Sequence, residues 1–89
     1  MEPIEMPIDG VLDLHIFQPR EIPDLLQDYL SLCFEKGIFQ VRIIHGKGQG
    51  ILKARVHSLL KTNPLVLHFV DAPAESGGWG ATLVELRRD

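Results

Sequence analysis

Features that mark secreted, membrane-bound and multidomain proteins are missing from this sequence. It has one cysteine, Cys33, which excludes an internal disulfide and a cysteine-based zinc cluster and indicates a reducing compartment. No apolar run approaches the roughly 18 residues of a membrane span. The first nine residues hold no cation, so no targeting leader is expected. The 89 residues leave room for one core. We therefore expect a cytoplasmic domain without membrane association, with a monomer as the default.

The residues that are present suit a soluble globular domain with an uneven charge. Hydrophobic residues make up 45% of the chain and charged residues 24%, which excludes a largely disordered chain. Residues 1–35 hold eight acids and one base, whereas residues 36–70 hold six bases and no acid, within a net charge of −3. This asymmetry predicts either an anion-binding surface or opposite charges that pair across the fold.

Hydrophobic periodicity divides the chain into a short tail and one domain. Residues 1–9 are expected to form the tail, because prolines disfavour regular structure there and Asp9-Gly10 signals a turn. The domain covers residues 10–89. Strands are expected over residues 11–16, 38–44, 65–70 and 81–86, and helices over residues 22–36 and 51–62, with a loop over residues 71–80.

Local signals support these elements. In the first strand, Leu12, Leu14 and Ile16 should share one face, with Asp13 and His15 on the other. In the last strand, positions 82, 84 and 86 should share one face in the same way. The first helix has a proline in its first turn and a glycine just beyond its end, where a left-handed cap is expected.

The predicted fold class is α/β, with the order β-α-β-α-β-β. Two right-handed crossovers in the same direction place both helices on one face of the sheet. The short last connection permits an antiparallel final strand. The expected architecture is a two-layer sandwich, in which a four-stranded mixed sheet has two helices on one face and a comparatively open second face.

Three polar residues are expected at the carboxyl ends of the first two strands, where ligands gather in parallel sheets. His15 ends the first predicted strand, His45 ends the second, and Asp13 lies one pleat before His15. If the two strands are neighbours, these side chains share one edge. They could act in general acid–base catalysis or contribute to a metal site. A purely structural role is the third possibility.

The glycine-rich segment after the second strand predicts an anion site. The free N–H groups and the dipole of the second helix point into this segment. The candidate phosphate ligands are Gly46, Lys47, Gly48, Gly50 and Lys53. The segment is neither a P-loop nor a dinucleotide fingerprint, because the required residues are absent. A turn that only needs glycine is the alternative.

A tryptophan flanked by glycines precedes the last strand. Trp79 could stack on a nucleic-acid base. It could equally anchor the loop against the edge of the sheet.

Together the motifs resemble those of the Smr domain, the small MutS-related family, over about residues 10–87. They are Leu12-Asp13-Leu14-His15, His45-Gly46-Lys47-Gly48, and Gly77-Gly78 followed by Gly80-Ala81-Thr82. The resemblance implies a short member without the MutS-type ATPase, and a fold similar to the C-terminal domain of a bacterial translation initiation factor. It also implies binding of DNA or RNA and, in several members, endonuclease activity. It assigns functional positions to Asp13, His15, His45, Gly46 and Gly48.

The first hypothesis is therefore an endonuclease that nicks DNA or cleaves RNA, with Asp13, His15 and His45 as catalytic residues. A divalent metal such as Mg is left open as a cofactor. One departure favours a binding module without catalysis, because Ile16 stands where the family commonly has glycine and would narrow the approach to His15. A protein-interaction domain is a third hypothesis, suggested by the acidic first third of the chain.

Overall fold

Four strands and two helices form two layers in the computed structural model, which describes residues 7–46, 50–76 and 78–88. The strands are β1 (Val11–Asp13), β2 (Gln40–Ile44), β3 (Val66–Asp71) and β4 (Ala81–Leu86), and the helices are α1 (Ile22–Glu35) and α2 (Ile51–Thr62). Single 3₁₀ turns lie at Pro19–Glu21, Ala74–Ser76 and Gly78–Gly80. This order confirms the predicted α/β fold class.

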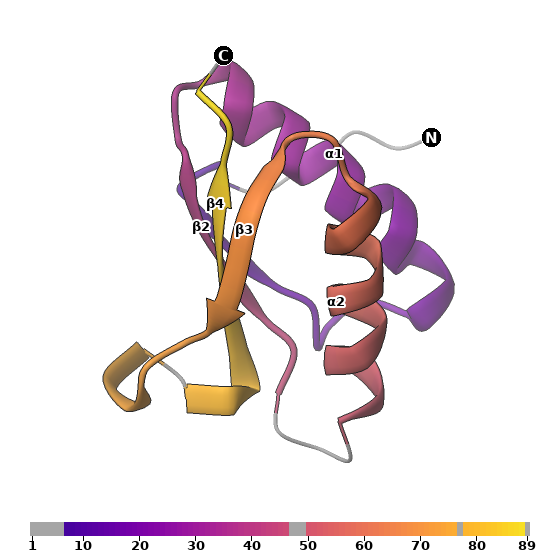
Figure 1. The fold of residues 1–89 in the computed structure, drawn as a ribbon. Helices are drawn as coiled ribbons and strands as arrows, with labels where there is room; N and C mark the ends of the chain where they lie inside the picture. The colour runs from indigo at the N-terminus through magenta and orange to yellow at the C-terminus, as the bar shows by residue number, and fades with distance from the viewer. Residues whose placement is uncertain (1–6, 47–49, 77, 89) are drawn as a thin grey trace.

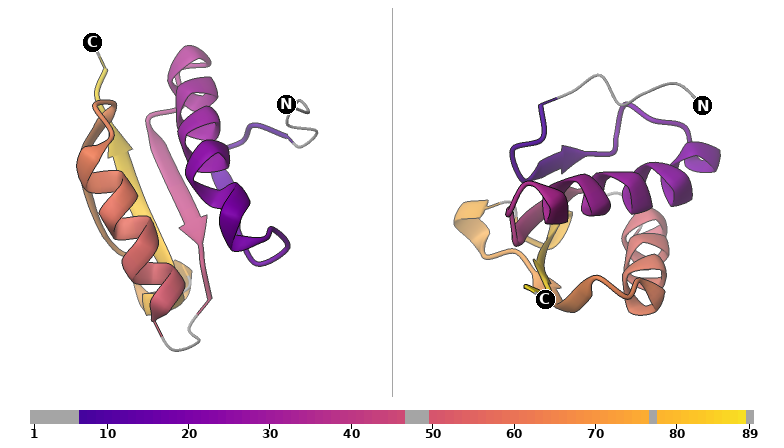
Figure 2. Two further views of the ribbon diagram at one scale, coloured as in Figure 1. Left: turned by 90° about the vertical axis from the view of Figure 1, so that its right-hand side faces the viewer. Right: turned by 90° about the horizontal axis from the view of Figure 1, so that it is seen from above.

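The sheet is mixed, with the strand order β1-β2-β4-β3. β1 and β2 are parallel, and β4 is antiparallel to both β2 and β3. The last strand therefore lies inside the sheet, between two strands that run in the same direction. Both helices cover one face, and the second face is open (Figures 1 and 2). No helix in the described part of the chain is long and apolar enough to cross a bilayer.

The first strand is shorter than predicted. β1 ends at Asp13, and Leu14 makes one more backbone hydrogen bond, its N–H donating to the Ile44 carbonyl over 2.9 Å. Beyond Ile44 its neighbour β2 has ended, so positions 15 and 16 have no ladder partner and the chain turns. Ile16 is consequently 71% exposed and does not join the buried face formed by Leu12 and Leu14.

Helix α1 packs one face against the sheet and ends in a glycine cap. Its buried residues recur at helical spacing, namely Ile22, Leu26, Tyr29, Leu30 and Cys33. Gly37 is left-handed, with φ at 76°. The Ile38 N–H donates to the Cys33 carbonyl and the Gly37 N–H to the Phe34 carbonyl, the two bonds of a Schellman motif. The predicted cap is therefore confirmed.

Tyr29 fastens helix α1 to the start of β1. Its hydroxyl accepts the Gly10 N–H over 3.1 Å and donates to the Val11 carbonyl over 3.0 Å. Burial is the main cause that raises the pKa of this phenol. The side chain is fully buried, so these bonds satisfy its one polar group inside the core.

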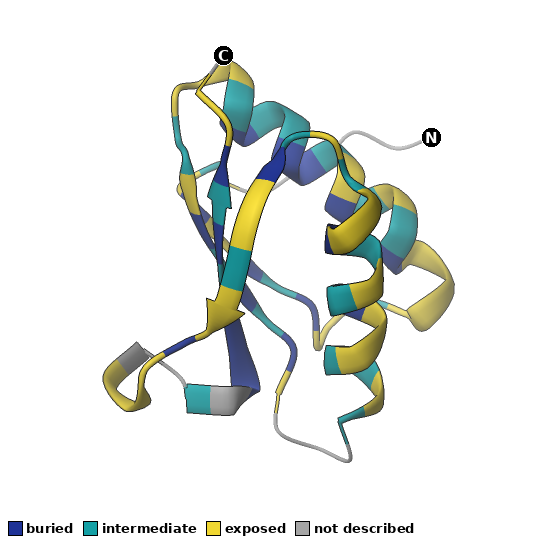
Figure 3. Cartoon of the chain, viewed as in Figure 1, coloured by how far each residue is buried: buried dark blue, intermediate teal, exposed yellow. Residues whose placement is uncertain are grey.

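Strand β4 is central and alternates as predicted. Thr82, Val84 and Leu86 are buried on the helix side, against Val41 and Ile43 of β2. Figure 3 shows buried positions concentrated on β2, β4 and the inner sides of the helices, with exposed positions along β3. The core thus lies between the sheet and the two helices, and it holds the ends of β1, β2 and β4 in fixed register.

Candidate functional site

The candidate site lies at the edge of the sheet where β1 and β2 end and β4 begins. Asp13 pairs with Ile44, and Ile44 pairs with Ala81, so three separate segments meet there. The N–H groups of His45 and Gly46 both donate to the Gly80 carbonyl, over 3.0 and 2.8 Å. The motifs predicted to come together therefore do share one edge.

Asp13 and His15 form an exposed carboxylate–imidazole pair. One oxygen of Asp13 accepts the backbone N–H of His15 over 3.1 Å and lies 2.5 Å from the imidazole Nδ1. The carboxylate accepts, so Nδ1 donates, and the neutral ring is left with an unprotonated Nε2. Nε2 has no hydrogen-bond partner among the described residues. The side chains are 68% exposed for His15 and 41% for Asp13.

The electrostatics of this pair keep Asp13 ionised. Burial acts to raise the pKa of the Asp13 carboxyl, but the backbone N–H and the ring of His15 together lower it below its usual value. The ionised Asp13 carboxylate holds Nδ1 of His15, and Nε2 has no partner among the described residues. A histidine oriented in this way can act as a general base.

His45 lies at the same edge but on the other face of the sheet. Asp13 and Ile44 occupy the open face, and His45, one residue further, turns toward the helices, where it is 5% exposed. Its Nδ1 donates to the Gly46 carbonyl over 3.1 Å, and its Nε2 lies 2.9 Å from the Thr82 hydroxyl. Within the described residues, no hydrogen bond or ring contact joins His45 to Asp13 or His15.

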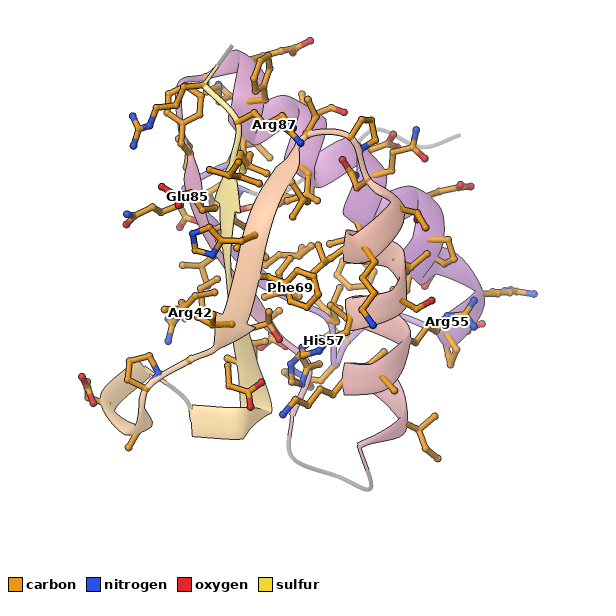
Figure 4. All side chains as sticks on the ribbon, viewed as in Figure 1. Arg42, Arg55, His57, Phe69, Glu85 and Arg87 are labelled. Atoms are coloured by element: carbon orange, nitrogen blue, oxygen red, sulfur yellow. The ribbon has the colours of Figure 1, made fainter. Side chains whose placement is uncertain are left out.

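Two residues around His45 were missed by the sequence analysis. Thr82 is completely buried, and its hydroxyl lies 2.9 Å from the Nε2 atoms of both His45 and His57. His57 comes from α2, and its ring also packs edge-on against Phe69 of β3 at 4.8 Å (Figure 4). The available signals were the place of Thr82 in the third motif and on the predicted inner face of the last strand, and the position of His57 next to Val56 in the second helix.

The predicted phosphate turn is described only at its two ends. Gly46 and Gly50 are left-handed, with φ at 81° and 79°, as the glycine pattern requires. Gly50 is the N-cap of α2, which has no side-chain cap and no acid in its first turn. The positive end of the α2 dipole therefore lies at Gly50 with no described side chain capping it, which favours an anion there. Lys47 and Gly48 lie outside the described residues, as does the side chain of Trp79.

Lys53 forms an ion pair with Asp71. Its ammonium lies 2.9 and 3.0 Å from the two carboxylate oxygens of Asp71 at the end of β3. This hydrogen bond is the main cause that lowers the pKa of Asp71. Lys53, predicted as a phosphate ligand, is thus one half of a charge pair between α2 and β3.

The described residues do not assemble a metal site. No three histidine, cysteine, aspartate or glutamate side chains among them lie close enough to share an ion. Asp13 and His15 supply two donors at most, and they already bind each other. Among the described residues the donor set is therefore too small to hold a divalent metal on its own, and the mechanism below assigns roles only to residues of the chain.

The Asp13–His15 pair stands on an open edge of the molecule. A hollow of about 440 Å³ exists on the open sheet face, lined by residues that include Gln40, Arg42, Leu83 and Glu85, but neither Asp13 nor His15 lines it. Figure 4 shows Arg42 and Glu85 on that face, away from the helices. An exposed reactive pair outside a pocket suits a polymer laid across the surface better than an enclosed small molecule.

Comparison with known proteins finds a matching family and several similar sequences. The family model described as Smr domain matches residues 12–87. The chain is 43% identical over 75 residues to Endonuclease MutS2 of Helicobacter pylori, covering 84% of this chain and 10% of that protein. It is 39% identical over 80 residues to Ribosome rescue factor SmrB of Aeromonas hydrophila, covering 90% of this chain and 46% of that protein. The chain therefore spans from a tenth to less than half of these relatives.

Two solved structures share the fold. The Smr domain of Thermus thermophilus MutS2 has a TM-score of 0.82 and 32% identity, covering 88% of this chain and 98% of that one. YdaL, a stand-alone small MutS-related protein from Escherichia coli, has a TM-score of 0.83 and 28% identity, covering 91% and 66%.

Proposed function

The chain belongs to the Smr domain family, and we propose that it is a nucleic-acid-binding domain that cleaves phosphodiester bonds as an endonuclease, nicking DNA or cutting RNA. The observation that carries the proposal is the exposed Asp13–His15 pair at the edge where three segments of the fold meet. The names of two relatives, an endonuclease and a ribosome rescue factor, support a nucleic-acid substrate.

In this proposal His15 is the general base. Its Nε2 takes the proton from the attacking oxygen, a water or a ribose 2′-hydroxyl, while that oxygen forms a bond to phosphorus. The P–O bond to the leaving oxygen breaks, and the leaving oxygen takes up a proton from water. Asp13 holds Nδ1–H and stabilises the imidazolium that results, as carboxylates do for catalytic histidines. A general base of this kind contributes about 10²–10⁴-fold to the rate.

The phosphate is proposed to lie near the glycine turn and the start of α2. No described side chain caps that helix at Gly50 and its first turn holds no acid, so the positive end of its dipole favours an anion there. The absence of acids from residues 36–70, the segment that contains this turn, favours the same partner. Lys47 and Lys53 are the proposed cations, Lys53 after release from Asp71.

A second candidate function is nucleic-acid binding without cleavage. Ile16 is 71% exposed directly beside His15, and the buried His45 gives no second imidazole on the exposed side of the edge. This candidate predicts binding that weakens with salt and with Lys47→Glu, and no cleavage with or without added metal.

The test compares cleavage and binding of supercoiled plasmid and structured RNA, with and without Mg²⁺ or Mn²⁺. The variant Asp13→Ala/His15→Ala should lose cleavage by at least about 100-fold and keep its affinity within a few-fold. The chain supplies a matched control in His68→Ala/Glu85→Ala, which removes another exposed carboxylate–imidazole pair, 2.6 Å apart, from β3 and β4. Equal loss in both double variants, or cleavage unchanged in the first, would reject Asp13 and His15 as the reacting pair.

A further inference from the structure

Thr82 joins two histidines that are far apart in the sequence. Its hydroxyl lies 2.9 Å from Nε2 of His45, at the end of β2, and 2.9 Å from Nε2 of His57, in α2. Thr82 is completely buried and His45 is nearly so. Among the described residues, every buried side-chain nitrogen and oxygen has a hydrogen-bond partner, and this includes those of Thr82 and His45.

Counting the protons fixes the direction of these bonds. The Gly46 carbonyl can only accept, so Nδ1 of His45 carries a proton and donates it over 3.1 Å. A neutral His45 then has a bare Nε2, which accepts the single hydroxyl proton of Thr82. The Thr82 oxygen in turn accepts N–H from Nε2 of His57. The chain runs in one direction, from His57 through Thr82 and His45 to the Gly46 carbonyl.

We propose that Thr82 and His57 are positioning residues, which hold His45 in its Nδ1–H form and thereby fix the Gly46 carbonyl at the start of the glycine turn. The consequence for ligand binding rests on the proposed function, because it matters only if the turn holds phosphate. The proposal gives His45 a supporting role on the helix side of the sheet, separate from the exposed Asp13–His15 pair.

A charged His45 would break this arrangement. Its Nε2 would then donate to the Thr82 oxygen, and among the described residues the Thr82 hydroxyl proton could be accepted only by His57, which would have to move its own proton from Nε2 to Nδ1. The backbone just before β4 holds the same segment, because the Gly80 carbonyl accepts the N–H groups of His45 and Gly46. His45 is therefore held by its backbone at Gly80 and by its side chain at Thr82.

The surroundings of His57 favour its neutral form as well. Burial is the main cause that lowers the pKa of His57, and Lys53 and Lys61 on its own helix and His45 from the sheet lower it further. Asp71 on β3 acts in the opposite direction. Phe69 covers the ring from β3 at 4.8 Å.

The first test reads the imidazole protons directly, by ¹⁵N NMR of the full chain without nucleic acid. We expect His45 to carry its proton on Nδ1 and His57 to carry one on Nε2. Thr82→Val removes the hydroxyl at nearly constant shape and should weaken the preference of His45 for Nδ1–H, because only the bond to the Gly46 carbonyl then favours it, whereas Thr82→Ser should keep the full preference. His57→Leu should weaken the preference in a second, independent variant. An Nε2–H form of His45 in the wild type, or identical spectra in wild type and Thr82→Val, would overturn the proposal.

The second test titrates inorganic phosphate and follows the amide shifts of Gly46 and Gly50. Thr82→Val should weaken phosphate binding several-fold, with Thr82→Ser close to wild type. Unchanged binding in Thr82→Val would contradict the effect on the turn. If wild type shows no phosphate shifts, the proposed phosphate site fails, and the tautomer of His45 still decides the positioning claim.

Discussion

Two exposed imidazole–carboxylate pairs have similar geometry but lie at different places in the sheet, and only one of them is proposed to react. Asp13–His15 and His68–Glu85 have similar spacing, 2.5 and 2.6 Å, and both are open to solvent. The first pair stands where β1 and β2 end, whereas the second links β3 to β4 within the sheet. Only the first has its imidazole on a turn beyond the ladder, free to meet a ligand.

The charge pair between Lys53 and Asp71 should limit the affinity for nucleic acid. Asp71→Asn removes a negative charge and leaves the Lys53 ammonium without its carboxylate partner at 2.9 Å, so RNA affinity should rise several-fold at low salt. The matched control is Glu75→Gln, which removes one charge from an exposed position in the nearby 3₁₀ turn. Fluorescence anisotropy with labelled RNA measures both. An effect of Asp71→Asn no larger than the control would exclude Lys53 as a phosphate ligand.

His57 should make stability depend on pH just below neutrality. Its pKa in the folded chain lies below the ordinary 6.5 because of burial, so between these values the unfolded chain binds more protons. The free energy of unfolding therefore falls as pH drops below about 6.5 and levels off below the folded pKa. Asp13 and Asp71 act only in a lower range, below about 3.8, because their pKa values are lowered.

Urea unfolding of wild type and His57→Gln at several pH values measures this contribution. Between neutrality and mildly acidic pH, the midpoint of wild type should fall more steeply than that of the variant. Parallel curves would show that the environment of His57 does not disfavour its charged form.

At the level of the elements, local sequence signals predict the ends of a helix or strand where neighbouring residues in the chain determine those ends. The helix α2 was predicted at its observed bounds because Gly50 begins it and Asn63-Pro64 stops it, and the Gly37 cap was predicted for the same reason. The end of β1 could not be predicted, because the last residue of its partner strand, Ile44, determines it. His15 therefore leaves the sheet although the alternation continues to Ile16.

Two left-handed glycines should differ in their tolerance of alanine. At Gly37, with φ at 76°, an added Cβ would meet nothing within 4 Å, so Gly37→Ala should cost only the backbone strain, about 1 kcal/mol. At Gly10, with φ at 90°, the Cβ would lie 3.0 Å from the Gln40 carbonyl and 3.2 Å from the Ile38 side chain. Gly10→Ala should therefore cost about 2–4 kcal/mol.

Thermal unfolding separates the two glycine variants. For a domain of this size, each kcal/mol lowers Tm by about 4–8 °C. We expect a modest decrease for Gly37→Ala and a decrease at least twice as large for Gly10→Ala. Equal decreases would mean that the close approach of Gly10 to β2 carries no energetic weight.

At the scale of the whole molecule, the two-layer arrangement of sheet and helices could be predicted from the sequence, but the contacts of the central strand β4 could not. The insertion of β4 between β2 and β3 is a non-local choice that no single segment encodes. It alone brings Thr82 against His45 and His57, residues 37 and 25 positions away. For the same reason, Asp13–His15 could be predicted from two residues that are two positions apart in the sequence, whereas the hydrogen-bond chain through Thr82 appeared only in three dimensions.

The two faces of the sheet carry residues with different proposed roles. The open side of the edge presents Asp13 and His15 to a substrate, and the helix side holds His45 and Thr82 in place under α2. This division predicts that small molecules dissolved in water reach the position of His15 more readily than that of His45. The side chain of His15 is 68% exposed, whereas His45 is only 5% exposed.

The most direct measurement is rescue of cleavage by free imidazole. His15→Ala should bind substrate like wild type, lose cleavage by about 100-fold or more, and regain part of it as imidazole is added, because the vacated site is open to solvent. His45→Ala should show no rescue, because its site is buried beneath α2. Wild-type cleavage by His15→Ala, or rescue of His45→Ala instead, would contradict the assignment of His15 as the reacting base.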